Sequence, residues 1–239
     1  MMKKMNIIGI IGSPRVNGNT STLIKEALKA ANNEGAKIQE IFLSKYNIQY
    51  CKGCMSCLST GRCVISDDNF EELRKIILEA DGLILGSPNY GGSISALLKT
   101  FFERYGLFEY ATSSLGGKYA VGISTSSEKM GANKVAKQTI KYIKEGVFKR
   151  GFISGTLGVA TNGEHVSHNK KAMEKAYGLG VNLAKDIKNK KRYTFQNSTQ
   201  RLLNRLVIRP IFKKFILKNK DGRMEGVYEN LRNRNLIDF

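Results

Sequence analysis

Short apolar segments alternate with longer amphipathic segments through most of this chain of 239 residues. The apolar segments predict β-strands at 5–11, 37–43, 82–86, 119–124 and 156–160. The segments between them predict helices near 20–33, 67–80, 93–105, 131–145 and 167–189. Repeated alternation of this kind favours a doubly wound parallel α/β sheet with right-handed crossovers.

The polarity of the predicted strands indicates where each lies in the sheet. Four of them are nearly continuous runs of apolar or small residues, as buried parallel strands require, whereas 37–43 is more polar and suits a sheet edge. Gly35 and Gly146 are expected to end helices with a positive φ. Ligands of such sheets bind at the carboxyl ends of the strands, so the loops after Ile11, Gly86, Ser124 and Ala160 are the places to examine.

The composition fits one soluble core with an appendage, because 41% of the residues are hydrophobic and 25% are charged. No apolar run approaches the roughly 18 residues that span a bilayer. The opening stretch MMKKMNIIGIIGSPR lacks a small-residue cleavage site and runs into a glycine-rich turn, so we interpret it as a strand rather than a signal peptide. We therefore expect a cytoplasmic protein, in a reducing compartment where stable disulfides are rare.

The net charge of +19 is unevenly spread, because residues 188–239 carry 14 Lys/Arg against 4 Asp/Glu. We predict a domain at 1–194 and a basic helical C-terminal extension at 195–239, in which Pro210 breaks or restarts a helix. Such positive charge could bind nucleic acid, anionic lipid, an acidic partner or a phosphorylated cofactor, and by itself it does not distinguish among them. We favour a packing role with Phe212, Phe215 and Ile216 buried, and expect neither nucleic acid nor a membrane surface as a partner.

The loop after the first strand reads GSPRVNGNTSTL and is rich in hydroxyl groups, supplied by Ser13, Thr20, Ser21 and Thr22. It is not a P-loop, because the Gly-Lys-Ser/Thr ending is absent. A helix start with free N–H groups and short hydroxyl donors can bind a phosphate without a metal. The plainer alternative is a strand–turn–helix connection with Thr20 as the helix N-cap. The convergence of glycine, proline and hydroxyl residues favours anion binding.

The loop after the third strand reads GSPNYGGSISALLKTFFER. Pro88 stiffens it, and Gly91 and Gly92 allow a flat ligand to approach the backbone closely. Tyr90 can lie along an aromatic ring, and Ser93 is expected to cap the next helix. Turn chemistry alone would also explain the loop, but two such loops at one sheet edge favour a ligand site.

Together the patterns GSPRxNGNTxxL and SPxYxxxxSxxLKxFxxR resemble the NAD(P)H-dependent FMN reductases of the flavodoxin-like superfamily, over about residues 5–190. The resemblance implies a five-stranded parallel sheet in the order 2-1-3-4-5 and an FMN in each subunit of a homodimer or homotetramer, where a neighbour completes the flavin site. By position, the residues implied to hold the FMN phosphate are Ser13, Arg15, Asn19, Thr20 and Ser21. Those implied to flank the isoalloxazine ring are Pro88, Asn89, Tyr90 and Gly91, with the loop STSSEKMG, which begins at Ser124, at the flavin edge.

All four cysteines lie within residues 51–63, in the segment CKGCMSCLSTGRC, after the second strand and on the expected ligand edge. Their C-x2-C-x2-C spacing lets three thiolates face one cubane and leaves Cys63 for the fourth corner. Zinc sites more often use two C-x2-C pairs that lie further apart, and a Cys51–Cys54 disulfide would leave an odd arrangement for the other two. A compact four-cysteine motif in this fold resembles the iron–sulfur flavoproteins, which implies a [4Fe-4S] cluster on Cys51, Cys54, Cys57 and Cys63. Redox-active or structural thiols and zinc remain alternatives.

The other titratable residues suggest no catalytic acid or base. His165 and His168 are the only histidines, and we interpret them as exposed residues around a helix start. Asp67 and Asp68 are read as an N-cap pair for the helix that follows. We therefore assign no catalytic side chain.

These features predict an FMN-dependent oxidoreductase that passes electrons between a donor, a cluster and FMN. The donor is ferredoxin or NAD(P)H, the acceptor is a small molecule such as a quinone, and the cofactors carry the bond chemistry. One alternative is a cluster-free NAD(P)H-dependent FMN or quinone reductase. Another is a redox-sensing protein that binds a polyanion through the basic extension.

Overall fold

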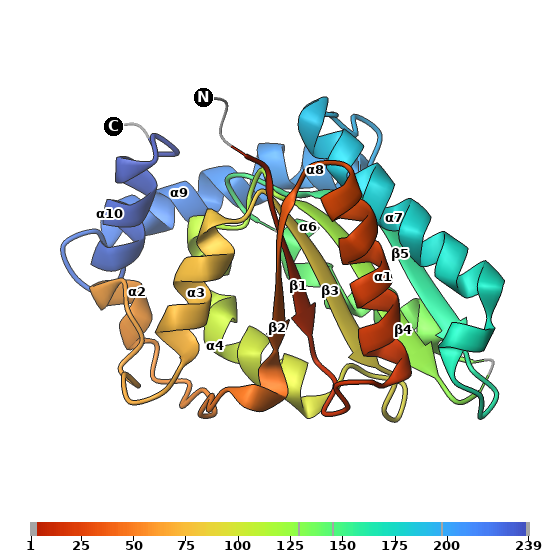
Figure 1. Ribbon diagram of the computed structural model, residues 1–239. Helices are drawn as coiled ribbons and strands as arrows, with labels where there is room; N and C mark the ends of the chain where they lie inside the picture. Colours follow the sequence, from red (N-terminus) through yellow and green to blue (C-terminus); the bar gives the residue numbers. More distant parts are fainter. Residues whose placement is uncertain (1–3, 129, 145, 197, 238–239) are drawn as a thin grey trace.

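The computed structural model describes residues 4–128, 130–144, 146–196 and 198–237. Its centre is a five-stranded parallel sheet in the order β2-β1-β3-β4-β5 (Figure 1). The strands are β1 (Asn6–Ile11), β2 (Lys37–Phe42), β3 (Gly82–Pro88), β4 (Tyr119–Ser126) and β5 (Phe152–Ala160). The predicted α/β class and the strand order 2-1-3-4-5 are confirmed.

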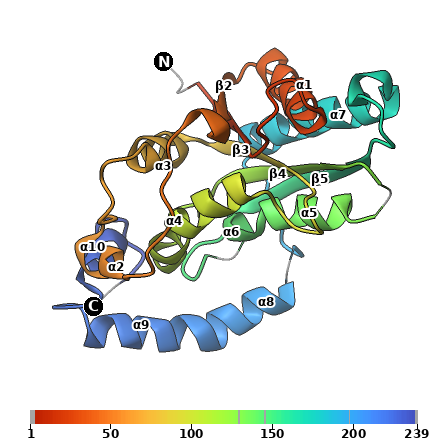
Figure 2. The same ribbon diagram turned by 90° about the horizontal axis from the view of Figure 1, so that it is seen from below.

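Helices cover both faces of the sheet (Figure 2). On one face lie α1 (Asn19–Asn33) and α7 (Lys170–Lys188); on the other lie α3 (Phe70–Glu79), α4 (Ala96–Thr112) and α6 (Lys141–Lys144). The alternation of β1 explains the two layers, because successive side chains of a strand point to opposite faces. Ile7 and Ile11 belong to the core beneath α1, and Ile8 and Ile10 belong to the core beneath α3 and α4. The strand at 37–43 lies at a sheet edge, as its polarity predicted.

Two predicted elements had the wrong extent. β5 begins at Phe152 rather than at residue 156, because Phe152 and Ile153 already pair with β4. The pairing resumes at Gly155 after a register shift between Ala120 and Val121. The helix predicted at 131–145 is divided into α5 (Ala132–Thr139) and α6. The buried Thr139 hydroxyl donates to the Ala136 carbonyl at 2.8 Å, a side-chain bond that competes with continued helical pairing.

Several predicted helix ends were also wrong. Ser95, not Ser93, caps α4, because its hydroxyl accepts from the Leu98 N–H at 3.3 Å while Ser93 pairs with the backbone of Tyr90. The N-cap of α1 is Gly18 rather than Thr20, which lies inside the first turn. Gly35 has the expected positive φ of 91°, but Gly146 is not among the described glycines with positive φ.

The C-terminal extension forms α8 (Ser198–Leu203), a π-helical turn η3 (Asn204–Ile208), α9 (Arg209–Lys218) and α10 (Glu225–Asn233). Pro210 lies in the first turn of α9, so it starts this helix as predicted. The extension runs beside the α/β body and returns next to α2 (Ser56–Thr60) in the cysteine segment (Figures 1 and 2). Ile216 is fully buried and Phe212 is half-buried, but Phe215 is 38% exposed, so the prediction of its burial was wrong.

The connections that remain include two short 3-10 helices, η1 (Leu43–Lys45) after β2 and η2 (Val166–His168) after β5. Within the described parts of the chain, every helix is too short or too polar to cross a bilayer.

Candidate functional site

A cavity of about 320 Å³ opens at the carboxyl ends of the strands, where the loops after β1, β3, β4 and β5 meet; we call it the strand-tip cavity. Most of the residues predicted for a flavin line it, and these are Ser13, Arg15, Asn19, Thr20, Pro88, Asn89 and Tyr90. Ser21 and Gly91 belong to the same loops but do not line the cavity. The structure therefore brings the two predicted loops together at one edge of the sheet.

The first loop is held in shape by its own hydroxyl groups. The Ser13 hydroxyl accepts from the Arg15 N–H at 3.2 Å, and the buried Ser21 hydroxyl donates to the Arg15 carbonyl at 2.7 Å. Both bonds fix the turn that carries Arg15 to the cavity, ahead of the start of α1. Ser21 thus has a local structural role, and Ser13 combines such a role with a place in the cavity wall.

Asn19 and Thr20 begin α1 and link this loop to other strand ends. The Asn19 amide accepts from the Val166 N–H at 2.8 Å and donates to the Glu164 carbonyl at 3.3 Å. The hydroxyls of Thr20 and Thr125 lie 2.7 Å apart, so one donates to the other across the cavity wall. These bonds position the N-terminus of α1, whose free N–H groups favour an anion.

The second wall is the loop after β3, which exposes its backbone. The Asn89 N–H donates to the Thr125 carbonyl at 2.7 Å, and the Gly92 N–H donates to the Asn89 side-chain oxygen at 2.9 Å. Gly91 and Gly92 have positive φ values of 58° and 80°, with open space where a Cβ would be. Tyr90 is 50% exposed. A flat ligand can therefore approach this loop closely.

The loop after β4, STSSEKMG, contributes to the cavity wall as predicted, except for its first residue. Ser124 is fully buried, its hydroxyl has no hydrogen-bond partner among the described residues, and it does not line the cavity. The residues that follow it do so instead: Thr125, Ser126 and Ser127. The polar run that ends this strand is the sequence signal for them. Lys129 in the same loop lies outside the described residues.

The residues of the strand-tip cavity fit an FMN. Arg15, hydroxyl groups, amides and the start of α1 suit a phosphate, and the described residues that line the cavity include no carboxylate. Thr161 and Gly163, from the loop after β5, also line it and were not predicted. His165 is exposed, as expected, with its Nε2 atom 3.1 Å from the Asn17 carbonyl oxygen at the rim of the first loop.

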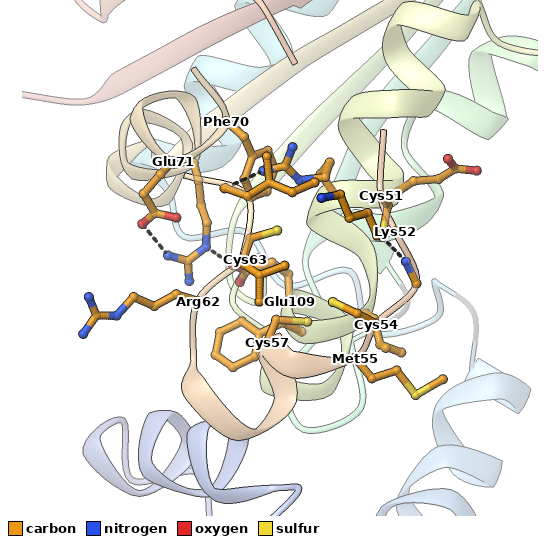
Figure 3. Close-up of a pocket in the computed structure, with 18 of the residues that line it drawn as sticks. Cys51, Lys52, Cys54, Met55, Cys57, Arg62, Cys63, Phe70, Glu71 and Glu109 are labelled. Carbon is orange, nitrogen blue, oxygen red and sulfur yellow. Dashed lines mark hydrogen bonds and ion pairs between the residues drawn. The ribbon is translucent and has the colours of Figure 1, made fainter. Parts of the chain in front are cut away.

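The four cysteines line a second cavity of about 50 Å³, which we call the cysteine cavity (Figure 3). All four thiols are free, with Cys51 and Cys54 exposed and Cys57 and Cys63 half-buried. Across the described ranges, no three His, Cys, Asp or Glu side chains are gathered into a site for a single metal ion. A four-iron cluster spreads its thiolates around a larger body than one ion does, so four free thiols around a common cavity fit it in type and number.

The cysteine thiols influence one another electrostatically. Burial, followed by the neighbouring thiols of Cys63, Cys54 and Cys51, raises the pKa of Cys57. Hydrogen bonds from Ser56 lower the pKa of the exposed Cys54. Like charges disfavour one another, so ionisation of several of these thiols together would be favoured by a positive centre among them.

Arg104 links the residues on the two sides of the cysteine segment. Its guanidinium donates to the Gln49 carbonyl at 3.0 Å and to the Ile65 carbonyl at 3.1 Å, on the two sides of residues 51–63. It also forms an ion pair with Asp68, in which both side chains are almost fully buried. Burial opposes ionisation of Asp68, but hydrogen bonds from Arg104 and from the N–H groups of Gln49 and Phe70 hold its pKa below the usual range. The Asp68 carboxylate accepts from the Phe70 N–H at the start of α3, but Asn69 is the N-cap residue, so the prediction of Asp67 and Asp68 as an N-cap pair was wrong.

A second buried pair lies beside the cysteines. Glu109 of α4 lines the cysteine cavity and pairs with Arg74 of α3. Burial raises the pKa of Glu109, and Arg74 opposes that shift. On the other side, α10 packs against α2, and Cys57 and Leu58 contact an apolar cluster that includes Val227. The C-terminal extension therefore forms part of the wall around the cysteine segment.

The strand-tip and cysteine cavities lie at different levels of α4. The first is next to the start of this helix, which follows Tyr90 and Ser95, whereas the second is lined by Glu103, Leu107 and Glu109. Of the α4 residues that line the cysteine cavity, Glu103 lies eight positions and Leu107 twelve positions beyond Ser95, a rise of roughly 12 to 18 Å. The cysteine segment leaves β2 at the expected edge but then runs along α4, away from the strand tips.

Comparison with known proteins agrees with this arrangement. The sequence profile described as NADPH-dependent FMN reductase matches residues 5–159. An iron-sulfur flavoprotein of Archaeoglobus fulgidus is 32% identical over 234 residues, which are 98% of this chain and 100% of that protein.

Solved structures show the same fold. An NAD(P)H:quinone oxidoreductase from Methanothermobacter marburgensis superposes with a TM-score of 0.59 at 16% identity, over 76% of this chain and 100% of that one. A flavodoxin from the domain Archaea superposes with a TM-score of 0.51 at 12% identity, over 77% and 99% of the two chains. These two likenesses establish a flavodoxin-like fold. Together with the profile match and the full-length relative, they show that the chain belongs to the NADPH-dependent FMN reductase family of FMN-dependent oxidoreductases.

Proposed function

We propose that this FMN-dependent oxidoreductase is an electron-transfer iron–sulfur flavoprotein. It takes electrons from ferredoxin or NAD(P)H, exchanges them between a [4Fe-4S] cluster and FMN, and delivers them to a small acceptor such as a quinone. When bound, FMN supplies two-electron and one-electron chemistry, and the cluster supplies one-electron chemistry. The protein's own residues bind these groups and control access to them.

In this proposal the strand-tip cavity holds FMN. Arg15, Asn19 and Thr20 bind the phosphate with the N–H groups at the start of α1, in a wall shaped by Ser13 and Ser21. The ring lies against the open backbone of the loop after β3, flanked by the residues Pro88, Asn89, Tyr90 and Gly91. The buried Ser124 supports the end of β4 rather than contacting the flavin.

The main support for a cluster is that four free thiols line one cavity. Arg104 bonds to both sides of their segment, so that the thirteen residues from Cys51 to Cys63 lie within a closed loop. Such a closed loop with four thiols is a ligand set for a cubane. The name of the relative that matches the whole chain, an iron-sulfur flavoprotein, supports the same choice.

We further propose a cytoplasmic homodimer or homotetramer. The two cavities are separated by a rise of roughly 12 to 18 Å along α4 in one chain. A neighbouring subunit that completes the flavin site can bring its own cysteine cavity closer to the flavin than this. Nothing in the scheme needs an acid or base from the protein, in keeping with the absence of an assigned catalytic side chain.

Anaerobic reduction of wild-type protein and of Cys63→Ser tests the proposal. Each is mixed with NADH, NADPH or reduced ferredoxin while flavin bleaching and the broad iron–sulfur absorption are followed separately. We expect a one-electron phase of cluster reduction in the wild type only, with FMN content unchanged in the variant. Full flavin reduction by NAD(P)H at equal rates in both, with no cluster signal in either, would identify a cluster-free reductase instead.

A further inference from the structure

Three arginines of the helical segment from α8 to α9 face the protein body across an open cavity, whereas several of its apolar side chains lie on the outer side. Its Arg201, Arg205 and Arg209 line a cavity against the connection between α6 and β5. On its outer side, Leu203 and Leu206 are 53% and 64% exposed. Figure 2 shows this segment running along one side of the body. A surface helix normally turns its apolar side inward, so three arginines on the inner side of this segment call for a reason.

We call this space the arginine cavity; its volume is about 360 Å³. A fourth arginine, Arg150, reaches it from the strand side, and Phe148 and Leu202 give it an apolar wall. The described residues that line it include no Asp or Glu. Glu145, the first residue of this connection, lies outside the described residues.

The partners of these arginines are neutral. Arg150 donates to the carbonyls of Tyr193 and Gln196, Arg201 donates to the Thr194 carbonyl, and Arg209 lies 5.6 Å from the centre of the Phe148 ring. Within the described chain Arg205 has no hydrogen-bond or ion-pair partner. Burial, and then the charge of Arg201, lower the pKa of Arg150, as expected when positive charges share a site without an anion.

Several guanidinium groups in one concave space repel each other unless an anion lies between them. Arginine presents paired N–H donors that match the oxygens of a phosphate group two at a time. A cavity of about 360 Å³ has room for more than a bare phosphate, and its apolar wall suits an organic part.

We propose that the arginine cavity binds a small soluble molecule that carries a phosphate group. The site is separate from the strand-tip cavity. Arg150 lies just before the first residue of β5, and the strand-tip cavity lies beyond the last; a strand of 9 residues spans roughly 26 Å. The bound anion also holds the C-terminal extension to the body, through arginines from both.

Calorimetric titration of the FMN-loaded protein with inorganic pyrophosphate tests this inference. FMN loading fills the phosphate site at the strand tips, so that the probe reports on the arginine cavity. The test variant is Arg205→Ala, which breaks no hydrogen bond or ion pair in the described chain, with Arg201→Ala added to it in a second variant. The matched control is the pair Lys214→Ala and Lys218→Ala, exposed on α9 outside the cavity.

We expect pyrophosphate to bind the wild type and the lysine control alike, and Arg205→Ala to weaken binding by about tenfold or more. FMN and iron contents should be equal in all variants, which separates this inference from the proposed function. No binding to the wild type, or equal weakening in the lysine control, would overturn it. Binding to phosphatidylcholine vesicles that contain phosphatidylserine, without pyrophosphate binding, would also overturn it and assign the arginines to a membrane surface.

Discussion

Gly226 of α10 lies directly against Gly61, the residue that ends α2 in the cysteine segment. A Cβ atom added at Gly226 would be 2.2 Å from the Gly61 nitrogen and 2.8 Å from its Cα atom. Gly61 itself has a φ of 72°, a conformation that other residues rarely adopt. The contact joins the C-terminal extension to the cysteine segment at a point where Gly226 has no room for a side chain and Gly61 adopts a left-handed backbone conformation.

Substitution Gly226→Ala should therefore separate α10 from α2. Because the obstacle is backbone rather than a flexible side chain, we expect a loss of about 1–3 kcal/mol in the free energy of unfolding, measured in urea. Gly222→Ala is the matched control, since a Cβ atom there meets nothing within 4 Å. The control should unfold like the wild type.

The same substitution should expose the third cysteine. Cys57 packs against the apolar cluster that includes Val227 and Leu231, so displacement of α10 opens it to solvent. Alkylation of metal-free protein, followed by peptide mass spectrometry, should show faster modification of Cys57 in Gly226→Ala, with Cys51 unchanged. Equal rates at Cys57 in the wild type and the variant would mean that α10 does not shield the segment.

Loss of the Arg104 guanidinium should weaken the fold strongly. Arg104→Met leaves the Asp68 carboxylate buried without its partner, so we expect a loss of about 3–5 kcal/mol in unfolding free energy at neutral pH. Lys99→Ala breaks an exposed pair with Glu103 one turn earlier in α4 and should change stability by less than about 1 kcal/mol. Similar losses in the two variants would contradict the importance of the buried pair. If Arg104→Met does not fold, Arg104→Lys serves in its place.

The contribution of the Arg104–Asp68 pair should also be visible in how stability depends on pH. The folded pKa of Asp68 lies below its unfolded value of about 3.9, so the pair stabilises the protein above that pH. This stabilisation is lost as the pH falls from about 4 through the folded pKa, because the unfolded state then binds the proton first. Urea unfolding should be measured between roughly pH 6 and pH 3. The free energy of unfolding should fall more steeply with decreasing pH in the wild type than in Asp68→Asn. Parallel curves would exclude Asp68 as the source.

Removal of a single hydroxyl should weaken FMN binding. Thr20→Val keeps the shape of the side chain but removes the hydroxyl that lies 2.7 Å from that of Thr125 in the cavity wall. Loss of a hydrogen bond to a charged phosphate should weaken FMN binding by roughly 10–100-fold in this variant. Fluorescence titration of apoprotein with FMN measures the affinity. Thr22→Val makes the same chemical change on a hydroxyl bonded to Gly18, outside the cavity, and should bind FMN normally. Equal affinity in both variants would show that Thr20 does not contact the phosphate.

The sheet and its two ligand loops could be predicted because their signals are local. The run of isoleucines from Ile7 to Ile11 and the turn that follows contain the information for a buried strand with a site at its end. The start of β5 escaped prediction because Gly155 reads as a loop residue until β4 is placed beside it. Ser93 and Ser95 are both suitable N-caps, and only the closure of the Tyr90 turn decides between them.

The wall around the cysteines could not be predicted, because it depends on contacts between distant residues. Arg104 bonds to carbonyls that are 55 and 39 residues away in the chain, so its role has no local signature. The two glycines at 61 and 226 are likewise ordinary turn or helix residues until α10 is placed against α2. Spacing alone could indicate that four thiols act together, but not which helices enclose them.

The most direct test of the account is the cofactor content of protein purified without oxygen. Iron, acid-labile sulfide and FMN are determined on one sample of the wild type, with Cys57→Ser as a second sample. The account predicts about four irons and four sulfides for each FMN in the wild type, and FMN without stoichiometric iron in the variant. Wild-type protein that is full of FMN but free of iron would contradict it.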